Sequence, residues 1–196
     1  MEIILGSASP RRKEILSYFS LPFKQVTSHF KEEDVPFLND PKQYTALLAQ
    51  KKALALAEAY PNDIILTADT TVFVKNKLFN KPSNEQEAIQ MLRELSGSWH
   101  QVFTGVCVRK EKLFFVDVEE SRIEFHALTE KQIQAYHKSF YFLDKAGGYA
   151  IQEGGSIVVK KIDGCFYNIM GFPINTVREL LLRVGIDLWD YLKSSL

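Results

Sequence analysis

Apolar residues along this chain recur in two patterns: short runs that are typical of strands, and spacings of three or four residues that are typical of helices. Residues 3–5 form a brief run rich in β-branched side chains and ended by Gly6, which predicts a buried strand. Ser9 is a favourable N-cap and Pro10 suits a first helical turn, so a helix should begin there. Helical spacing and terminal signals predict helices over residues 10–19, 40–60, 85–95, 129–136 and 175–183.

Two apolar runs in the first half of the chain are separated by polar residues. Residues 64–66 and 72–74 are typical of buried sheet, whereas residues 67–71 between them read Thr-Ala-Asp-Thr-Thr. We interpret this stretch as a polar break in a buried strand. Residues 102–125 are rich in Val, Phe and Ile around a polar turn at residues 110–112, which predicts a β-hairpin. Further strands are predicted at residues 24–27, 149–152 and 156–162.

The order of these elements predicts the fold class. Strands and helices alternate at both ends of the chain, with the hairpin between them, which indicates an α/β fold with a mixed twisted sheet and flanking helices. The chain has no repeat, low-complexity tract or linker, so we expect one domain over residues 1–196. The hairpin region would form the second lobe of an elongated two-lobed domain, and a central cleft between two lobes is a natural place for a ligand.

Charge balance and cysteine content exclude several classes of protein. The chain has 24 Lys and Arg residues and 24 Asp and Glu residues, so its overall field favours neither stable binding to nucleic acid nor attachment to an anionic membrane. No stretch is long and apolar enough to cross a bilayer, and the first residues lack the basic and apolar segments of a signal peptide. Cys107 and Cys165 have no metal-ligand or redox spacing, which indicates a reducing compartment. We therefore expect a cytoplasmic protein whose anion-binding groups are local.

The segment after the first strand has the features of a phosphate site. Ser7 and Ser9 lie in a short loop before the predicted helix, where backbone N–H groups and the helix dipole favour an anion. Arg11 and Arg12 add two cations to the first turn, and a planar guanidinium can bind two phosphate oxygens at once. On spacing alone, the two arginines are equally compatible with a solvated helix face.

Acidic residues and single lysines supply the other candidates. Asp69 lies in the polar stretch of a buried strand, where a carboxylate is costly unless it is paired, bound to metal or exposed in a cleft. It could coordinate a divalent ion, orient a water or accept its proton, or it could have a structural role in a turn or cap. The acidic run at residues 32–34 offers the hard oxygen ligands that Mg²⁺ or Mn²⁺ prefers, or is a solvated loop. Lys52 and Lys81 could converge on a polyphosphate or lie on the surface.

Several short motifs occur in one order along the chain, and together they resemble the Maf family. Neither the P-loop signature nor the dinucleotide-binding fingerprint occurs beside them. The likeness covers nearly the whole chain. The motifs that carry it are Ser7-Ala8-Ser9-Pro10-Arg11-Arg12, Leu48-Ala49-Gln50-Lys51-Lys52-Ala53, Ala68-Asp69-Thr70, Lys81-Pro82, Leu95-Ser96-Gly97, Asp144-Lys145-Ala146-Gly147-Gly148-Tyr149-Ala150-Ile151-Gln152 and Gly171-Phe172-Pro173.

Resemblance to the Maf family implies a nucleoside triphosphate pyrophosphatase of the fold shared with inosine triphosphate pyrophosphatases, acting with a divalent metal such as Mg²⁺ or Mn²⁺. It implies that Asp69 is the proton acceptor or metal-linked base and that Glu33 is its acidic partner at the metal. Ser7 would lie in the phosphate loop. A homodimer is common for this type of fold, and the sequence leaves the oligomeric state open. The cations that the resemblance places around the phosphates are Arg11, Arg12, Lys52 and Lys81.

Three positions distinguish the branches of this family. The combination of Arg11, Thr70 and Gln152 resembles the branch that hydrolyses dTTP and UTP, and modified pyrimidine nucleotides would suit the same site. The branch that acts on 7-methyl-GTP tends to have an aromatic residue, a Gln and a Glu at those places. A side-chain amide such as that of Gln152 can both donate and accept a hydrogen bond, which suits the imide edge of thymine or uracil.

Two other functions stay open from the sequence. The first is a regulator of cell division or septum formation that binds nucleotide or nucleic acid without hydrolysing it, although the candidate Asp69 and the balanced charge argue against it. The second is a phosphatase that releases orthophosphate. Incubation with a panel of nucleotides and Mg²⁺, followed by identification of the released phosphate species, separates all three functions.

Overall fold

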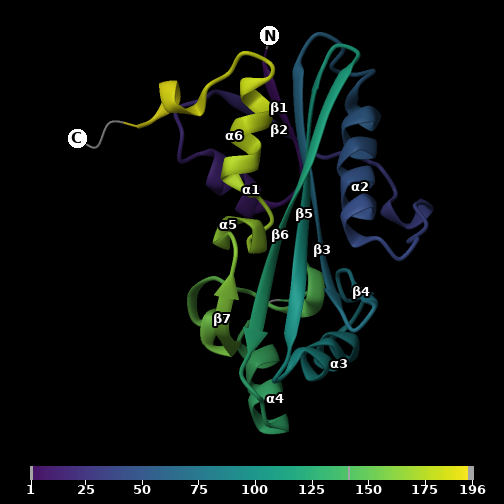
Figure 1. Cartoon of the computed structure of the whole chain (residues 1–196), viewed down its shortest axis with the longest axis vertical. Helices are drawn as coiled ribbons and strands as arrows, with labels where there is room; N and C mark the ends of the chain where they lie inside the picture. Colours follow the sequence, from purple (N-terminus) through teal and green to yellow (C-terminus); the bar gives the residue numbers. More distant parts are fainter. Residues whose placement is uncertain (1, 141, 194–196) are drawn as a thin grey trace. The chain divides into compact units, whose positions relative to one another are not determined.

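The computed structural model describes residues 2–140 and 142–193 (Figure 1). The chain divides into two compact units. Unit 1 comprises the described parts of Met1–Asp69, Thr104–Glu119 and Gly171–Leu196. Unit 2 comprises the described parts of Thr70–Phe103 and Glu120–Met170. A single domain with a central cleft stays a prediction. Three strands contribute residues to both units, namely β3 (Ile64–Val74), β5 (Trp99–Lys110) and β6 (Leu113–Phe125).

The strands of the described residues form one mixed sheet. Its shorter members are β1 (Ile3–Gly6), β2 (Phe23–Val26), β4 (Lys77–Phe79) and β7 (Val159–Asp163). The seven strands have the order β2-β1-β3-β5-β6-β7, with β4 paired to β3 beside this path. β1 pairs in parallel with β2 and β3, whereas the β3–β4 and β6–β7 pairs are antiparallel. The predicted α/β class with a mixed sheet is therefore confirmed.

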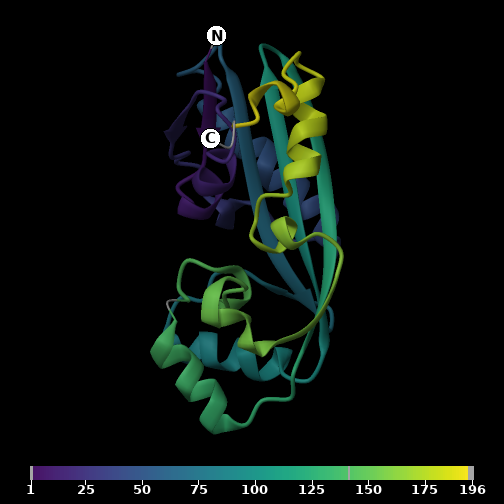
Figure 2. The ribbon, with the colours of Figure 1, turned by 90° about the vertical axis from the view of Figure 1, so that its left-hand side faces the viewer.

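In unit 1, α2 (Pro41–Leu56) and α6 (Ile174–Leu182) cover opposite faces of the sheet (Figures 1 and 2). α1 (Pro10–Leu16) begins at the predicted cap, where the Ser9 side chain accepts a hydrogen bond from the Arg12 N–H, but it ends earlier than predicted. The short helices η1 (Glu32–Asp34) and η4 (Leu188–Tyr191) complete the unit. α2 packs against β1, β3 and β5 through an apolar cluster of Ile4, Ala49, Ala53, Leu56, Ile65 and Cys107.

In unit 2, two helices begin directly after residues whose side chains cap them. α3 (Glu85–Leu95) follows Asn84, whose side chain accepts a hydrogen bond from the third helical N–H. α4 (Glu130–Ser139) follows Thr129, which forms a reciprocal capping box with Gln132. α3 matches the predicted residues 85–95, whereas α4 begins within one residue of the predicted start at residue 129 and continues three residues beyond the predicted end at residue 136.

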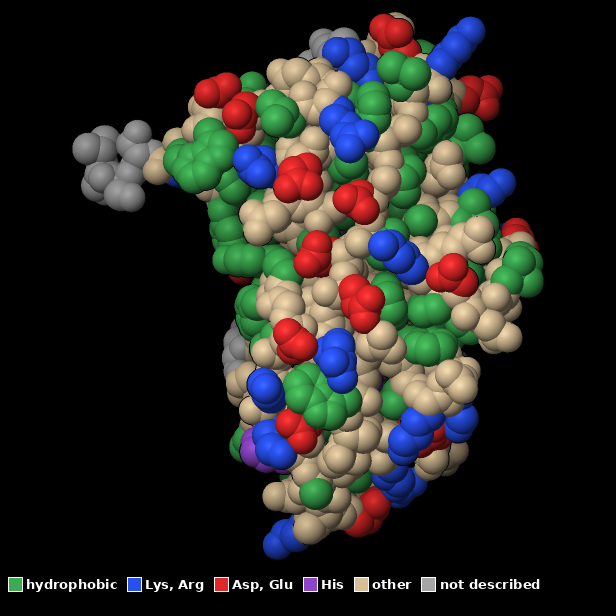
Figure 3. Space-filling view, in the orientation of Figure 1, with side chains coloured by type: hydrophobic (Ala, Val, Ile, Leu, Met, Phe, Trp, Pro, Cys, Tyr) green, Lys and Arg blue, Asp and Glu red, His purple; other side chains and the backbone are tan. Residues whose placement is uncertain are grey.

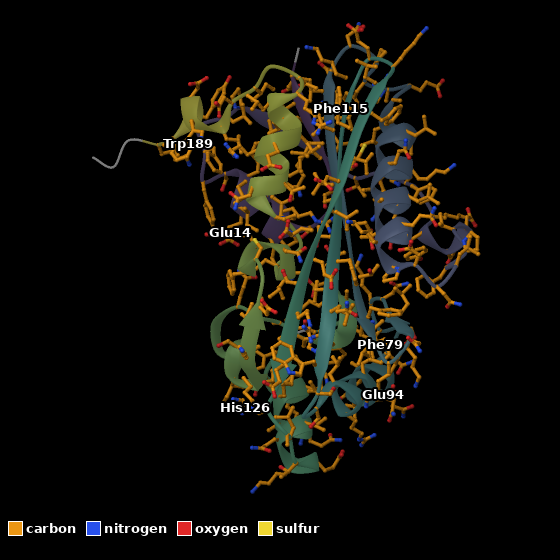
Figure 4. The ribbon with its side chains drawn as sticks, in the orientation of Figure 1. Glu14, Phe79, Glu94, Phe115, His126 and Trp189 are labelled. Carbon is orange, nitrogen blue, oxygen red and sulfur yellow. The ribbon has the colours of Figure 1, made fainter. Side chains whose placement is uncertain are left out.

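β4 is fixed to α3 in unit 2. The Nζ atom of Lys77 on β4 lies 2.8 Å from an Oε atom of Glu94 on α3, and Phe79 is buried in the adjoining core (Figure 4). The remaining elements of this unit are η2 (Ala146–Gly148), η3 (Glu153–Val158) and α5 (Phe166–Ile169). The core cluster of unit 2 comprises Val72, Val74, Phe79, Ile89, Met91, Leu92, Leu95, Val102, Ile123, Phe125, Ile133, Tyr136, Tyr149 and Val158.

The polar stretch at residues 67–71 lies inside a buried strand, as predicted, and it does not interrupt that strand. β3 is continuous, with Thr67, Asp69 and Thr71 buried within it. The Thr67 hydroxyl donates a hydrogen bond of 2.6 Å to the Ala49 carbonyl of α2. Polar side chains can occupy a buried strand when a neighbouring element supplies their partners.

The predicted strand at residues 149–152 is wrong. These residues lie between η2 and η3 and are not assigned to a strand, although Tyr149 and Gln152 have extended backbone angles. The Ala150 N–H donates to the Tyr136 hydroxyl at 2.9 Å instead of to a neighbouring strand. The predicted strand over residues 156–162 begins later, at Val159, because η3 occupies its first residues.

Unit 2 contains a buried histidine. His100 of β5 is 2% exposed, and its Nε2 atom lies 2.9 Å from the Tyr149 hydroxyl oxygen. Its ring meets the rings of Phe125 and Tyr149 edge-on. Burial lowers the pKa of His100 to about 3, because the charged imidazolium would lose its hydration.

This histidine predicts acid sensitivity. An unfolded imidazole titrates near pH 6.5, so His100 costs no stability above that pH and an increasing amount as the pH falls toward 3. Between about pH 7 and pH 5, the free energy of unfolding should fall by about 2 kcal/mol more in the wild type than in His100→Gln, whose amide does not titrate. Urea unfolding at the two pH values measures the difference. Equal losses in the two proteins would contradict the prediction.

Charged side chains of both signs are interspersed over the face of each unit that Figure 3 displays. That face lacks the extended basic surface typical of proteins that grip nucleic acid through its phosphates. Within the part of the chain that the structure describes, no helix combines the length and the apolar character that a membrane span requires.

Candidate active site

Asp69 lies inside β3 on the face that packs against α2. Alternate residues of a strand share a face, so Asp69 follows Ile65, which packs on α2, and Thr67, which bonds to its backbone. Lys52 lies one helical turn after Ala49 on the same face of α2. Its ammonium forms a hydrogen-bonded ion pair with the Asp69 carboxylate, and the two residues are only 8% and 5% exposed. Two predicted site residues are thus brought together in unit 1.

A second carboxylate reaches the same ammonium from η1. The Oε1 atom of Glu32 lies 2.7 Å from Lys52 Nζ. Lys52 therefore lies between two carboxylates, those of Glu32 and Asp69. Glu33, the acidic partner that the family resemblance implies, is the neighbouring residue and is exposed. The acidic run over residues 32–34 therefore lies at the site. Within it, the tight turn of η1 directs the side chain of Glu32, and not that of Glu33, toward Lys52.

The electrostatic environment suits Asp69 to accept a proton. Burial raises the pKa of its carboxyl group above the usual range, since the charged form loses hydration. The positive charge of Lys52 acts in the opposite direction, and the negative charge of Glu32 adds to the rise. A buried carboxylate held ionised by a neighbouring ammonium is a better base than an exposed aspartate.

Arg12 joins the loop after β1 to the strand that carries Asp69. Its Nη1 atom donates to the Ala68 carbonyl at 2.7 Å and to the Ser7 hydroxyl at 3.1 Å. Its Nε atom donates to the Gly171 carbonyl at 2.8 Å. Burial lowers the pKa of Arg12, while the charges of Asp69 and Glu32 favour its cationic form. Ser7 and Arg12 are therefore brought together, as their common motif predicts, and Arg12 is bonded to the residue before Asp69.

Gln25 belongs to this network and is absent from the predicted site. Its side-chain amide donates to the Ser7 carbonyl at 2.8 Å and to the Ser9 carbonyl at 3.3 Å. Gln25 lies near the carboxyl end of β2, in register with Leu5 at the end of the parallel strand β1. Carboxyl ends of parallel strands meet at one edge of a sheet, so a polar residue within the short predicted strand over residues 24–27 was the available signal.

The other predicted residues lie on both units. Arg11 is half-buried on α1 in unit 1, next to Arg12. Thr70 is half-buried on β3, and Gln152 is half-buried after η2, both in unit 2. Lys81 is exposed after β4 in the same unit. The carbonyl of the preceding Asn80 accepts a hydrogen bond of 3.1 Å from the Gly147 N–H, which connects the Lys81 segment to the segment that leads to Gln152.

Comparison with known proteins matches the sequence of the chain to one family. The family model described as "Maf-like protein" covers residues 2–184. The chain belongs to the Maf family. Two Maf relatives named "dTTP/UTP pyrophosphatase" are 46% identical in Chlamydia caviae and 45% identical in Chlamydia felis, each covering 97% of this chain and 98% of the relative. The Staphylococcus aureus Ham1 structure matches at 12% identity and a TM-score of 0.42 over 98% of this chain and 94% of that chain, a likeness too weak to bear on the fold or the site.

The Maf site contains oxygen ligands that fit a divalent cation. Asp69 and Glu32 both contact the ammonium of Lys52, so the two carboxylates are within reach of a shared positive charge. No three His, Cys, Asp or Glu side chains gather into a metal site within residues 2–140 and 142–193. Mg²⁺ commonly takes one or two carboxylates from the protein and completes its shell with water and substrate phosphates, so two carboxylates are sufficient.

Proposed function

We propose that this chain hydrolyses dTTP and UTP, and modified pyrimidine nucleotides of the same shape, to the monophosphate and pyrophosphate. The observation that carries the proposal is the buried ion pair of Asp69 and Lys52, which the partly exposed Glu32 joins, beside Arg12. Burial of the Asp69 carboxylate and the Lys52 ammonium carries a desolvation cost, and buried charges with perturbed pKa values cluster at functional sites. Maf membership and relatives named dTTP/UTP pyrophosphatase over 97% of the chain support the substrate.

Asp69 accepts a proton from the attacking water as the water oxygen bonds to the α-phosphorus. The bond from the α-phosphorus to its bridging oxygen breaks, and pyrophosphate leaves with the electron pair. Lys52 keeps Asp69 ionised before the step. Arg12 holds the Ala68 carbonyl, which fixes the backbone at Asp69. The phosphate charges are balanced by cationic side chains, for which we propose Arg11, Arg12, Lys52 and Lys81, with Ser7 in the phosphate loop.

A divalent cation, Mg²⁺ or Mn²⁺, would neutralise the triphosphate when bound. We assign its protein ligands to Asp69 and to the acidic turn of η1, where Glu32 faces the site and Glu33 is the neighbour that the family resemblance implies.

This assignment predicts unequal effects of two neighbouring substitutions. Glu32→Gln should lower kcat/KM for dTTP about ten- to a hundredfold, because it weakens the metal ligation and removes a charge beside Lys52. Glu33→Gln, at an exposed position, should change it less than about twofold. Steady-state kinetics over a range of Mg²⁺ concentrations measures both variants. A larger loss of kcat/KM in Glu33→Gln than in Glu32→Gln would indicate that Glu33, and not Glu32, is the metal ligand.

Gln152 and Thr70 are assigned to recognition of the base. The imide edge of thymine or uracil presents one N–H donor between two carbonyl acceptors, and the amide of Gln152 can pair with one donor and one acceptor. Cytosine presents a different order of donors and acceptors at this edge. A site built to satisfy a hydrogen-bonding group rejects an analogue that leaves the group unpaired, so Gln152 supplies discrimination.

The test is a comparison of dTTP, UTP, CTP and 7-methyl-GTP with Mg²⁺ or Mn²⁺, in which pyrophosphate and orthophosphate are measured separately. We expect pyrophosphate and monophosphate from dTTP and UTP, and a loss of this preference in Gln152→Glu. Release of orthophosphate would make the chain a phosphatase. Nucleotide binding without monophosphate under any metal would favour a non-catalytic regulator of cell division.

We also propose that the enzyme acts in the cytoplasm. Cys107 is buried, Cys165 is half-buried, and both are free thiols. Burial raises the pKa of the Cys107 thiol to about 12, which makes it unreactive. Free thiols of this kind are typical of proteins from reducing compartments.

A further inference from the structure

One hydroxyl group fixes the backbone on both sides of Gln152. Tyr136 of α4 is 4% exposed, and its hydroxyl oxygen accepts a hydrogen bond of 2.9 Å from the Ala150 N–H. The same hydroxyl lies 3.1 Å from the Ala150 carbonyl and 3.3 Å from the Gly155 carbonyl, either of which can accept its proton. We call these contacts the Tyr136 bracket. They join α4 to the residues that flank Gln152, all within unit 2.

The opposite side of this segment is anchored in the core of unit 2. Tyr149 and Ile151 are buried, and the Tyr149 ring packs edge-on against Phe125 with a centroid separation of 4.8 Å. Along an extended backbone successive side chains point to opposite sides, so Tyr149 and Ile151 turn Gln152 away from the core. Packing in the core therefore determines the side to which the Gln152 side chain points, and the Tyr136 bracket holds the backbone on either side of Gln152.

The segment depends on the bracket because sheet pairing does not hold it. Residues 149–152 are not assigned to a strand, and the Gln152 carbonyl accepts a local hydrogen bond of 3.1 Å from the Gly155 N–H. Without the Tyr136 hydroxyl, the Ala150 N–H would lose its partner in a half-buried position. Short segments without sheet partners are the parts of a protein that open most readily.

We infer that Tyr136 is a positioning residue for base discrimination, which acts by holding the backbone around Gln152 in one conformation. The inference rests on the proposed function and on Gln152 as the residue that reads the base. Loss of the bracket should weaken the contacts to dTTP and UTP, which use the amide in its fixed position. Cytosine presents the donor and acceptor in the opposite order, so it pairs with the amide only if the amide oxygen and nitrogen exchange places; CTP should therefore lose less.

The experiment compares the wild type with Tyr136→Phe and Ile133→Val. Tyr136→Phe removes only the hydroxyl and keeps the ring, whose centroid lies 5.0 Å from that of Phe140. Ile133→Val removes one buried methyl group from the same helix without touching the bracket, and so controls for a general loosening of α4. In Tyr136→Phe, the ratio of kcat/KM for dTTP to that for CTP should fall about three- to tenfold, the effect of one hydrogen bond. Ile133→Val should keep the wild-type ratio.

Hydrogen exchange provides a readout that does not depend on activity. The peptide that spans residues 149–155 should exchange faster in Tyr136→Phe than in the wild type and Ile133→Val. If the peptide over residues 149–155 exchanges at the same rate in Tyr136→Phe as in the wild type, the inference is overturned, whichever nucleotide the enzyme hydrolyses. Equal losses of kcat/KM for dTTP and CTP in Tyr136→Phe also overturn the inference, because they indicate that Tyr136 has only a structural role. Failure of the wild type to release pyrophosphate is a separate result and counts against the proposed function.

Discussion

Asp69→Asn is expected to abolish the release of pyrophosphate from dTTP and UTP, with kcat lower by at least about a hundredfold. Asparagine has nearly the same shape but can neither take the proton of the attacking water nor supply a negative charge to a divalent cation. Burial disfavours the charged form of Asp69, and Lys52 keeps its partner Glu32 after the substitution. The variant should therefore fold as stably as the wild type while losing its activity.

Pyrophosphate release at saturating dTTP measures the effect, with thermal unfolding followed in parallel. Asp117→Asn is a matched control, because Asp117 is an exposed carboxylate on β6 whose Oδ1 accepts the Val118 N–H. This control should keep wild-type turnover. Near-normal pyrophosphate release by Asp69→Asn would remove Asp69 from the proposed chemistry.

The fold was predictable from sequence where local signals agree. α3 matches the predicted residues 85–95 and α4 begins within one residue of its predicted start, because each helix has a side-chain cap followed by an apolar stripe. Local signals fail where a hydrogen-bond partner from a distant part of the sequence determines the conformation. The Ala150 backbone bonds to the Tyr136 hydroxyl, a partner from a separate helix that no pattern within residues 149–152 reveals. The Thr67 hydroxyl likewise finds its acceptor on α2, so a polar stretch stays inside β3.

Some contacts of the candidate site were predictable from the sequence, and others depend on how the elements pack. Ser7 and Arg12 share one motif and one turn, and the structure joins them. Asp69 and Lys52 were named separately, and their pairing follows only from the packing of α2 on β3. The choice between Glu32 and Glu33 depends on the direction of the η1 turn, which a run of three acids does not encode.

Lys52→Met should cost about 3–5 kcal/mol of the free energy of unfolding, because it leaves the buried carboxylate of Asp69 without its ammonium partner. Methionine keeps much of the lysine side-chain volume, so loss of charge rather than loss of packing dominates. A carboxyl group whose pKa is raised in the folded state destabilises that state as the pH rises through that pKa. The cost of Lys52→Met should therefore be larger at about pH 8 than at about pH 5, where Asp69 can take up a proton.

A double-mutant cycle isolates the ion pair from the other contacts of Lys52. In the Asp69→Asn background no buried charge is left at residue 69, so Lys52→Met should cost at least about 1–2 kcal/mol less than in the wild type. Lys51→Met, at the exposed neighbouring position on α2, should change the stability by no more than about 0.5 kcal/mol. Urea unfolding of the four proteins of the cycle and of this control gives the coupling energy. An equal cost of Lys52→Met in both backgrounds would mean that Lys52 is held by Glu32 and its packing, and that Asp69 reaches its charged state without it.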